Sequence, residues 1–391
     1  MKKEKSKKQH YNEQTFLFSS CALINGDIYS VTNMDSIPIK VNLKTRKMSC
    51  ISQGKDKFIN SEDILADNDE MYLLEQNGYR MMKFNVETGL YKYYTIFCHR
   101  KEWGNYAAYA KFKKKIYIFP KYMDYMVKID LETGLIKKDP SLYSEVKKLY
   151  KKSKDNEGFI YFWYGFQSKK QVWLFQKSKK EVYVYDLEVE NWKQYILPLE
   201  VNSCVHIVLK NRIFYILSSE GEIYTWNLDN NDMKVLADFQ ISSDDNAFVR
   251  IAVTDNMIFM LPGTEKNIYW LNLKNGSRGM YKDYPTCFEY CSPDIWSKYL
   301  GYCEDNNNYY FAMRSSMFIL CINKKNSDLK WLEIDPPSDK EYFGAHYKIG
   351  DLLHENQWSL QELIDYMDFE NIDTRKWENI GRIIWNQIKF F

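Results

Sequence analysis

The feature that most constrains this chain is an Asp or Asn that recurs seven times, each time after a run of apolar and β-branched residues. In the clearest copy, Lys128-Ile129-Asp130 is followed by Leu131-Glu132-Thr133-Gly134. An Asx side chain accepts hydrogen bonds from the backbone just ahead of it, and a following Gly takes a positive φ without steric cost. The pattern therefore predicts a strand that runs into a tight hairpin turn. The seven Asx residues are Asn42, Asn85, Asp130, Asp186, Asn227, Asn272 and Asn323.

The spacing of these turns indicates a repeat architecture. Successive positions differ by 43, 45, 56, 41, 45 and 51 residues. The average is about 47, near the roughly 40–50 residues of a propeller blade. Each unit divides into four strand-like runs. The second runs share a polar, aliphatic, aromatic order that is typical of a sheet, and we expect their aromatic rings to fill the space between neighbouring units. Those rings belong to Tyr29, Tyr72, Tyr117, Trp173, Phe214 and Phe259.

Seven such units predict an all-β fold, a seven-bladed β-propeller of four-stranded blades over residues 15–337. The first and seventh units are both complete, so we expect the ring to close by ordinary blade packing, without strand exchange. The turns Ile129–Gly134 and Phe84–Gly89 resemble the repeats of kelch-type and quinoprotein-like propellers. The double Gly of kelch repeats is missing, and Leu135 and Leu90 stand where quinoprotein-like blades carry a Trp. The chain as a whole resembles a bacterial propeller protein, a resemblance that implies a fold and no particular activity.

Three segments depart from the repeat. Residues 1–14 carry five Lys without the apolar run of a signal peptide, which predicts a disordered basic tail. An insertion at 141–158 predicts a short helix in an exposed segment, with Leu142, Val146 and Leu149 on one face. Residues 338–391 form a third region, in which the apolar period changes to that of a helix.

The C-terminal region predicts two helices. Ser359-Leu360-Gln361-Glu362 has the pattern of a capping box. In the second helix an apolar stripe recurs at i, i+3, i+7 and i+11. Short helices are marginal in isolation, so the stripe must be buried, either on the propeller or against a partner or a second copy of the chain. The stripe consists of Trp377, Ile380, Ile384 and Ile388.

Composition narrows the class of partner. Aromatic residues make up 17% of the chain, which favours strands. The 54 Lys and Arg nearly balance 52 Asp and Glu, so the net charge of +2 provides no field for nucleic acid or an anionic membrane. No apolar run approaches the roughly 18 residues of a membrane helix. We expect a cytoplasmic location and no nucleic-acid partner.

Motifs for cofactor and metal chemistry are missing from the sequence. The eight Cys show no CxxC spacing and no His/Cys cluster, which argues against a zinc site. Phosphate-binding Gly loops, a nucleophile elbow and dinucleotide fingerprints do not occur either. We expect no metal, no cofactor and no catalytic residues.

Candidate binding residues lie in the long loops that would meet at one mouth of the central channel. Exposed aromatic rings there would stack on sugar rings or peptide side chains, an Arg and the Asp pair would orient the ligand, and a His would act as acid or base. Each has a simpler interpretation: an aromatic packs its loop down, a lone His lies on the surface, and Asp-Asp forms a solvated turn. The candidates are His99, Arg100, Trp103, Asp244, Asp245, Trp296, Tyr342 and His346.

Two functions remain open at this point. The first is a non-catalytic propeller that binds a protein or peptide through this loop face, with the C-terminal helices as a dock or a dimer contact. The alternative is a carbohydrate-directed propeller, either a glycan-binding module or a glycan lyase or hydrolase. The alternative requires acid, base and aromatic groups such as Asp244, His99 and Tyr342 within hydrogen-bond reach of one another.

Overall fold

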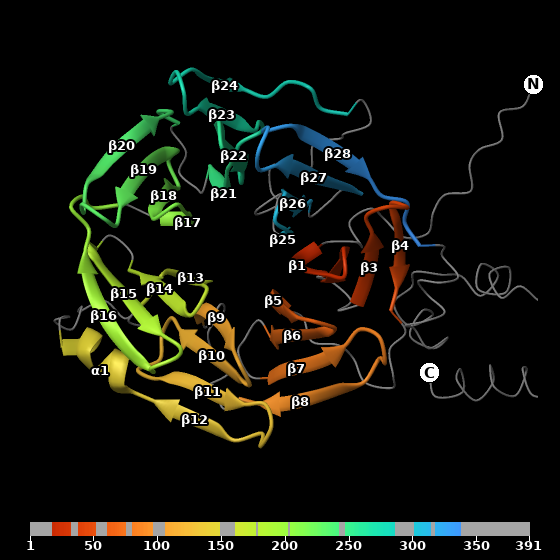
Figure 1. The fold of residues 1–391 in the computed structure, drawn as a ribbon, viewed down its shortest axis with the longest axis vertical. Helices are drawn as coiled ribbons and strands as arrows, with labels where there is room; N and C mark the ends of the chain where they lie inside the picture. Colours follow the sequence, from red (N-terminus) through yellow and green to blue (C-terminus); the bar gives the residue numbers. More distant parts are fainter. Residues whose placement is uncertain are drawn as a thin grey trace, which may run out of the picture.

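Seven four-stranded antiparallel sheets form a ring around a central space, with the first strand of each sheet innermost (Figure 1). In each sheet the four strands pair in chain order, as the repeat predicts. The chain is therefore a seven-bladed β-propeller. This computed structural model describes residues 18–32, 38–51, 61–75, 80–96, 106–148, 161–176, 179–201, 204–241, 247–285, 301–313 and 317–337.

The first four blades follow one another directly along the chain. Blade 1 contains β1 (Phe18–Ile24), β2 (Asp27–Thr32), β3 (Pro38–Asn42) and β4 (Lys47–Cys50). Blade 2 contains β5 (Ser61–Asp67), β6 (Glu70–Glu75), β7 (Arg80–Asn85) and β8 (Tyr91–Thr95). Blade 3 contains β9 (Tyr106–Phe112), β10 (Lys115–Pro120), β11 (Met126–Asp130) and β12 (Ile136–Asp139). Blade 4 contains β13 (Tyr164–Ser168), β14 (Gln171–Phe175), β15 (Glu181–Asp186) and β16 (Asn191–Ile196).

The last three blades complete the ring. Blade 5 contains β17 (Cys204–Lys210), β18 (Ile213–Ser218), β19 (Glu222–Asn227) and β20 (Met233–Asp238). Blade 6 contains β21 (Phe248–Val253), β22 (Met257–Pro262), β23 (Tyr269–Asn272) and β24 (Arg278–Met280). Blade 7 contains β25 (Gly301–Glu304), β26 (Asn308–Ala312), β27 (Phe318–Asn323) and β28 (Leu329–Glu333).

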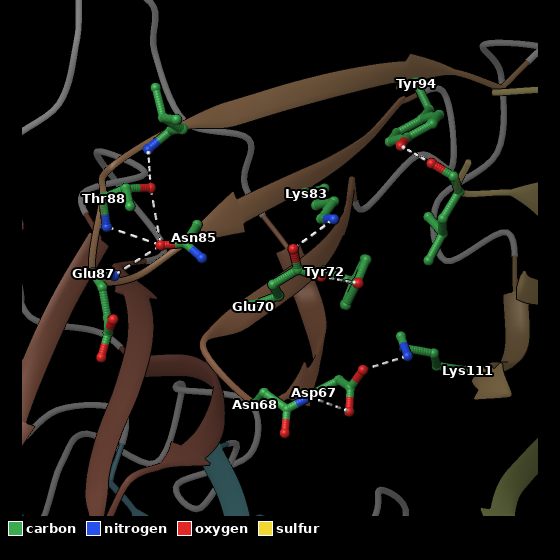
Figure 2. Close-up of polar contacts among 12 residues, drawn as sticks. Asp67, Asn68, Glu70, Tyr72, Lys83, Asn85, Glu87, Thr88, Tyr94 and Lys111 are labelled. Carbon is green, nitrogen blue, oxygen red and sulfur yellow. Dashed lines mark hydrogen bonds and ion pairs between the residues drawn. The ribbon is translucent and has the colours of Figure 1, made fainter. Parts of the chain in front are cut away.

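The turn after each third strand confirms the Asx pattern. Every third strand ends at its predicted Asx, whose side chain accepts a hydrogen bond from the amide two residues later at 2.8–3.1 Å. Figure 2 shows blade 2, where Asn85 also accepts hydrogen bonds from the amide and the hydroxyl of Thr88, at 2.8 and 2.9 Å. One local interaction therefore fixes the same hairpin seven times.

The residue four positions after each Asx has a positive φ. Gly occupies this position in three turns and an L-residue in four. A positive φ costs an L-residue about 1–2 kcal/mol, so a side chain placed there needs a compensating contact. The four L-residues are Arg46, Glu190, Asn231 and Ser327.

Apolar clusters fill each of the seven interfaces between neighbouring blades. The aromatic residues of the second strands are at most 5% exposed, and each belongs to such a cluster, as predicted. At the crowded centre small residues are required. A Cβ on Gly165 of β13 would come within 2.9 Å of the Ala108 Cβ in blade 3.

The predicted helix in the insertion is α1 (Ser141–Lys148), which lies outside blades 3 and 4 (Figure 1). Leu142 and Val146 are fully buried, as the one-face pattern requires, and Leu149 lies outside the described residues. The helix packs more deeply than an exposed insertion implies. Tyr143 is also buried, and its hydroxyl donates to the Pro120 carbonyl oxygen at 2.7 Å.

The ring closes between blades 7 and 1 without strand exchange, as predicted. A latch that the sequence did not indicate adds to the packing. Beyond β28 the chain forms a parallel bridge with β4, in which Asp335 N–H donates to Arg46 O and Met48 N–H donates to Asp335 O, both at 2.8 Å. Ile334, only 2% exposed, packs into the same interface.

Glu190 clamps blade 4 to blade 3 from one of the positive-φ positions. Its carboxylate accepts hydrogen bonds from Lys115 Nζ at 2.6 Å, Lys128 Nζ at 2.8 Å and Tyr117 Oη at 3.0 Å. Burial opposes the charge, but these donors outweigh it and lower the pKa of Glu190 to about 2. These hydrogen bonds offset the cost of the positive φ at Glu190.

Replacement of this carboxylate tests the clamp. We expect Glu190→Gln to lower the free energy of unfolding by about 1–3 kcal/mol at pH 7, because Lys128 and Tyr117, which are largely buried, lose a charged acceptor. The measurement is urea unfolding. A depressed carboxyl pKa stabilises the fold above the unfolded value, so the difference between variant and wild type should shrink as pH falls from about 4.5 towards about 2.

Glu188→Gln is the matched control in the same turn. Glu188 pairs with Lys170 at 2.6 Å, but both side chains are about half exposed. Its loss should leave the urea unfolding midpoint almost unchanged, because solvent screens an exposed ion pair. Equal losses for the two variants would contradict the clamp.

Candidate functional site

The binding residues predicted from the sequence all lie outside the described residues. These are His99, Arg100, Trp103, Asp244, Asp245, Trp296, Tyr342 and His346, together with the apolar stripe Trp377, Ile380, Ile384 and Ile388. Their roles stay predictions. The basic tail 1–14 and the C-terminal region 338–391 also lie outside the described residues.

The described residues enclose a cavity of about 650 Å³ in the central channel, between the inner strands of blades 4 to 7. It opens where first strands turn into second strands, because its lining includes Ser168, Lys210 and Asp255 at three of these turns. The long loops that carry the binding residues predicted from the sequence are expected at the opposite mouth, where one blade joins the next. The wall contains several aromatic side chains: Tyr164, Phe166, His206, Tyr302 and Tyr309.

His206 of β17 lies at the centre of this wall and is only 3% exposed. Its Nδ1 accepts a hydrogen bond from the Ile251 N–H of β21 at 3.3 Å. The neutral ring must therefore carry its proton on Nε2. Within the described ranges this Nε2–H has no hydrogen-bond partner.

Two tyrosines hold the imidazole in place. The rings of Tyr164 and Tyr302 both meet it edge to face, with centroids 5.9 Å from its own. Burial, with a smaller contribution from the Arg250 guanidinium, holds the pKa of His206 well below its usual range. The cavity wall thus presents a neutral hydrogen-bond donor between aromatic rings.

The mouth of the cavity carries charges that are already paired. Lys210 Nζ lies 2.7 Å from an Asp255 carboxylate oxygen, and Lys324 Nζ lies 2.6 Å from one of Glu304. The Lys210 ammonium keeps the pKa of Asp255 below its usual range. Lys324 Nζ also sits 4.6 Å from the centre of the Tyr309 ring. These two ion pairs cancel their own charges, and Lys325 adds one exposed positive charge at the rim.

This arrangement suits binding better than proton transfer. A general base needs a free acceptor, but the protonated Nε2 of His206 has none and the two carboxylates are held by lysines. Among the residues that the structure describes, no three His, Cys, Asp or Glu side chains gather as metal ligands would. Within the same residues, no helix is long and apolar enough to span a membrane.

No sequence pattern pointed to this cavity. His206 follows Cys204 and Val205 in an ordinary apolar strand, and Tyr164 and Tyr302 match the strand-forming aromatic residues found throughout the chain. These residues come from blades 4, 5 and 7 and meet only because the ring brings their inner strands together. A His in the first strand of a unit was the one available signal, since that strand lines the channel.

The sequence matches no protein-family model and no curated protein. Its fold is similar to several solved structures. A streptogramin B lyase aligns with a TM-score of 0.53 and 12% identity, over 77% of this chain and 91% of that one. The computationally designed protein Ika8 aligns with a TM-score of 0.51 and 10% identity, over 82% and 90% of the two chains.

PorZ, a surface component of the type-IX secretion system of Porphyromonas gingivalis, aligns with a TM-score of 0.52 and 12% identity. The alignment covers 83% of this chain and 38% of PorZ. Identities this low show the propeller fold alone.

The neutral state of His206 predicts a pH-dependent stability. A His with a depressed folded pKa stabilises the fold above its unfolded pKa of about 6.5, and this stability is lost as pH falls, because only the unfolded chain takes up the proton. We expect wild type to lose up to about 2 kcal/mol more than His206→Asn between pH 6.5 and pH 5 in urea unfolding. Parallel pH profiles for the two proteins would show that the folded chain also protonates His206.

Proposed function

We propose that the protein is a non-catalytic binding propeller whose ligand enters the channel cavity of blades 4 to 7. The observation that carries this proposal is the lining. Aromatic surface and an unpartnered donor lie inside, while two ion pairs at the mouth hold Lys210, Asp255, Lys324 and Glu304. The volume of about 650 Å³ falls within the roughly 300–1,000 Å³ of cavities that bind small ligands.

A glycan fits this lining better than a charged peptide does. Flat aromatic rings suit the C–H faces of sugar rings, and the planar amides of Asn306 and Asn307 at the mouth suit their hydroxyl groups. A protein or peptide partner at the loop face, with the C-terminal stripe as a dock or dimer contact, stays a prediction. So does the cytoplasmic location.

A bulky side chain at the mouth tests the site. Asn307 is exposed at the rim and its side chain makes no hydrogen bond within the described residues, so Asn307→Trp should fold and obstruct entry. Lys44→Trp, in an exposed turn of blade 1 on the same face, is the matched control. Each protein is dialysed against a pool of oligosaccharides and short peptides, and the bound molecules are identified by mass spectrometry.

We expect wild type and Lys44→Trp to retain the same molecules, at unchanged mass, and Asn307→Trp to retain at least about tenfold less. Equal retention by Asn307→Trp would place the site elsewhere. Recovery of the retained molecules as cleaved or eliminated products would replace the binding proposal with a catalytic one.

A further inference from the structure

One hydrogen-bond donor on the cavity wall is available to a ligand atom. His206 is only 3% exposed, yet its Nε2–H has no hydrogen-bond partner within the part of the chain that the structure describes. His206 lines the cavity, so this donor can be reached by a ligand atom. The fold holds this donor in place through Ile251 N–H on the other side of the ring and through the edges of Tyr164 and Tyr302.

The chemistry of the acceptor follows from the charges around it. The imidazole is neutral, so it donates without the charge that would attract an anion. The ammonium groups of Lys210 and Lys324 are held by Asp255 and Glu304, and neither needs an anionic ligand. Lys325 at the rim is exposed, where solvent and salt screen its charge. Arg250 is a further cation near the imidazole, and its guanidinium carbon lies 5.7 Å from the centre of the Tyr302 ring. Because Arg250 does not line the cavity, a neutral oxygen is the better partner for Nε2–H.

The side chains of the wall also favour a ligand with a neutral oxygen. Tyr164 of β13 and Tyr302 of β25 both contact the imidazole edge to face, so a ligand oxygen bound at Nε2–H would have aromatic rings close by. A sugar ring suits this arrangement, because its C–H groups and its hydroxyl groups alternate around one small frame. At the mouth, Asn306 and Asn307 add amides that both donate and accept.

We propose that the channel cavity binds a neutral saccharide, with His206 Nε2–H donating to one of its oxygens and the rings of Tyr164 and Tyr302 against its C–H faces. This inference rests on the proposed function, because it assigns a ligand class to the same cavity. His206 is then a residue that determines specificity. It selects neutral oxygen acceptors over anions and over groups that only donate.

Two substitutions of His206 separate its roles. In His206→Asn, the side-chain amide oxygen lies near the position of Nδ1 and still accepts the hydrogen bond from Ile251 N–H. This variant has no donor at the position of Nε2. Gln places an amide N–H near the position of Nε2 and keeps the donor. Full-length wild type, His206→Asn and His206→Gln are titrated calorimetrically with three probes: neutral di- to tetrasaccharides of glucose, galactose, mannose and xylose, uronic-acid oligosaccharides of the same lengths, and neutral tetrapeptides.

We expect a neutral saccharide to bind wild type, to bind His206→Asn about tenfold more weakly, and to bind His206→Gln within about threefold of wild type. Thermal unfolding checks that both variants fold. Asn307→Trp should abolish the same binding.

The other outcomes separate the two proposals. Binding of peptides or uronic-acid oligosaccharides alone, blocked by Asn307→Trp, would overturn the neutral-saccharide inference and leave the cavity as the site. Saccharide binding that is equal in wild type and His206→Asn would overturn the role of His206. Failure of every neutral saccharide to bind overturns the inference. Binding that Asn307→Trp leaves unchanged would overturn the proposed function as well.

Discussion

The hydrogen bond from an Asx side chain to the amide two residues ahead is the interaction on which this propeller depends. It recurs at the end of all seven third strands. Because the bond is local, the geometry of each turn is specified within the sequence of its own hairpin. The register of the two outer strands follows from the turn, and with it the set of apolar side chains that each blade presents to the next.

The same turns also join the blades. Glu190 and Ser327 occupy positive-φ positions where Gly would be less strained, and both contact the preceding blade: Glu190 through two lysines, and Ser327 through a 2.6 Å hydrogen bond between its hydroxyl and that of Thr254. Lys210 of blade 5 and Asp255 of blade 6 form an ion pair across the boundary between those two blades. The channel cavity opens on this face, so its walls are held by contacts between blades that do not depend on a ligand.

Much of the fold was predictable, because its signals are short in range. The seven Asx residues, the buried aromatic residues of the second strands and the buried face of α1 were all predicted correctly from patterns of a few residues. The latch at Asp335 was not, since two backbone hydrogen bonds between residues almost 300 positions apart leave no pattern in the sequence. The channel cavity left no pattern in the sequence for the same reason, and the candidates in the long loops stay predictions.

The sequence by itself determined the repeat, the number of blades and the surface of each blade that is buried, because turn chemistry and period-2 alternation act within one unit. Only the tertiary structure decided what the channel contains. Tyr164, His206 and Tyr302 lie in three different blades, and nothing local distinguishes them from other strand residues. The closed ring brings them together and buries most of His206, which leaves a neutral imidazole with its one donor on the cavity wall.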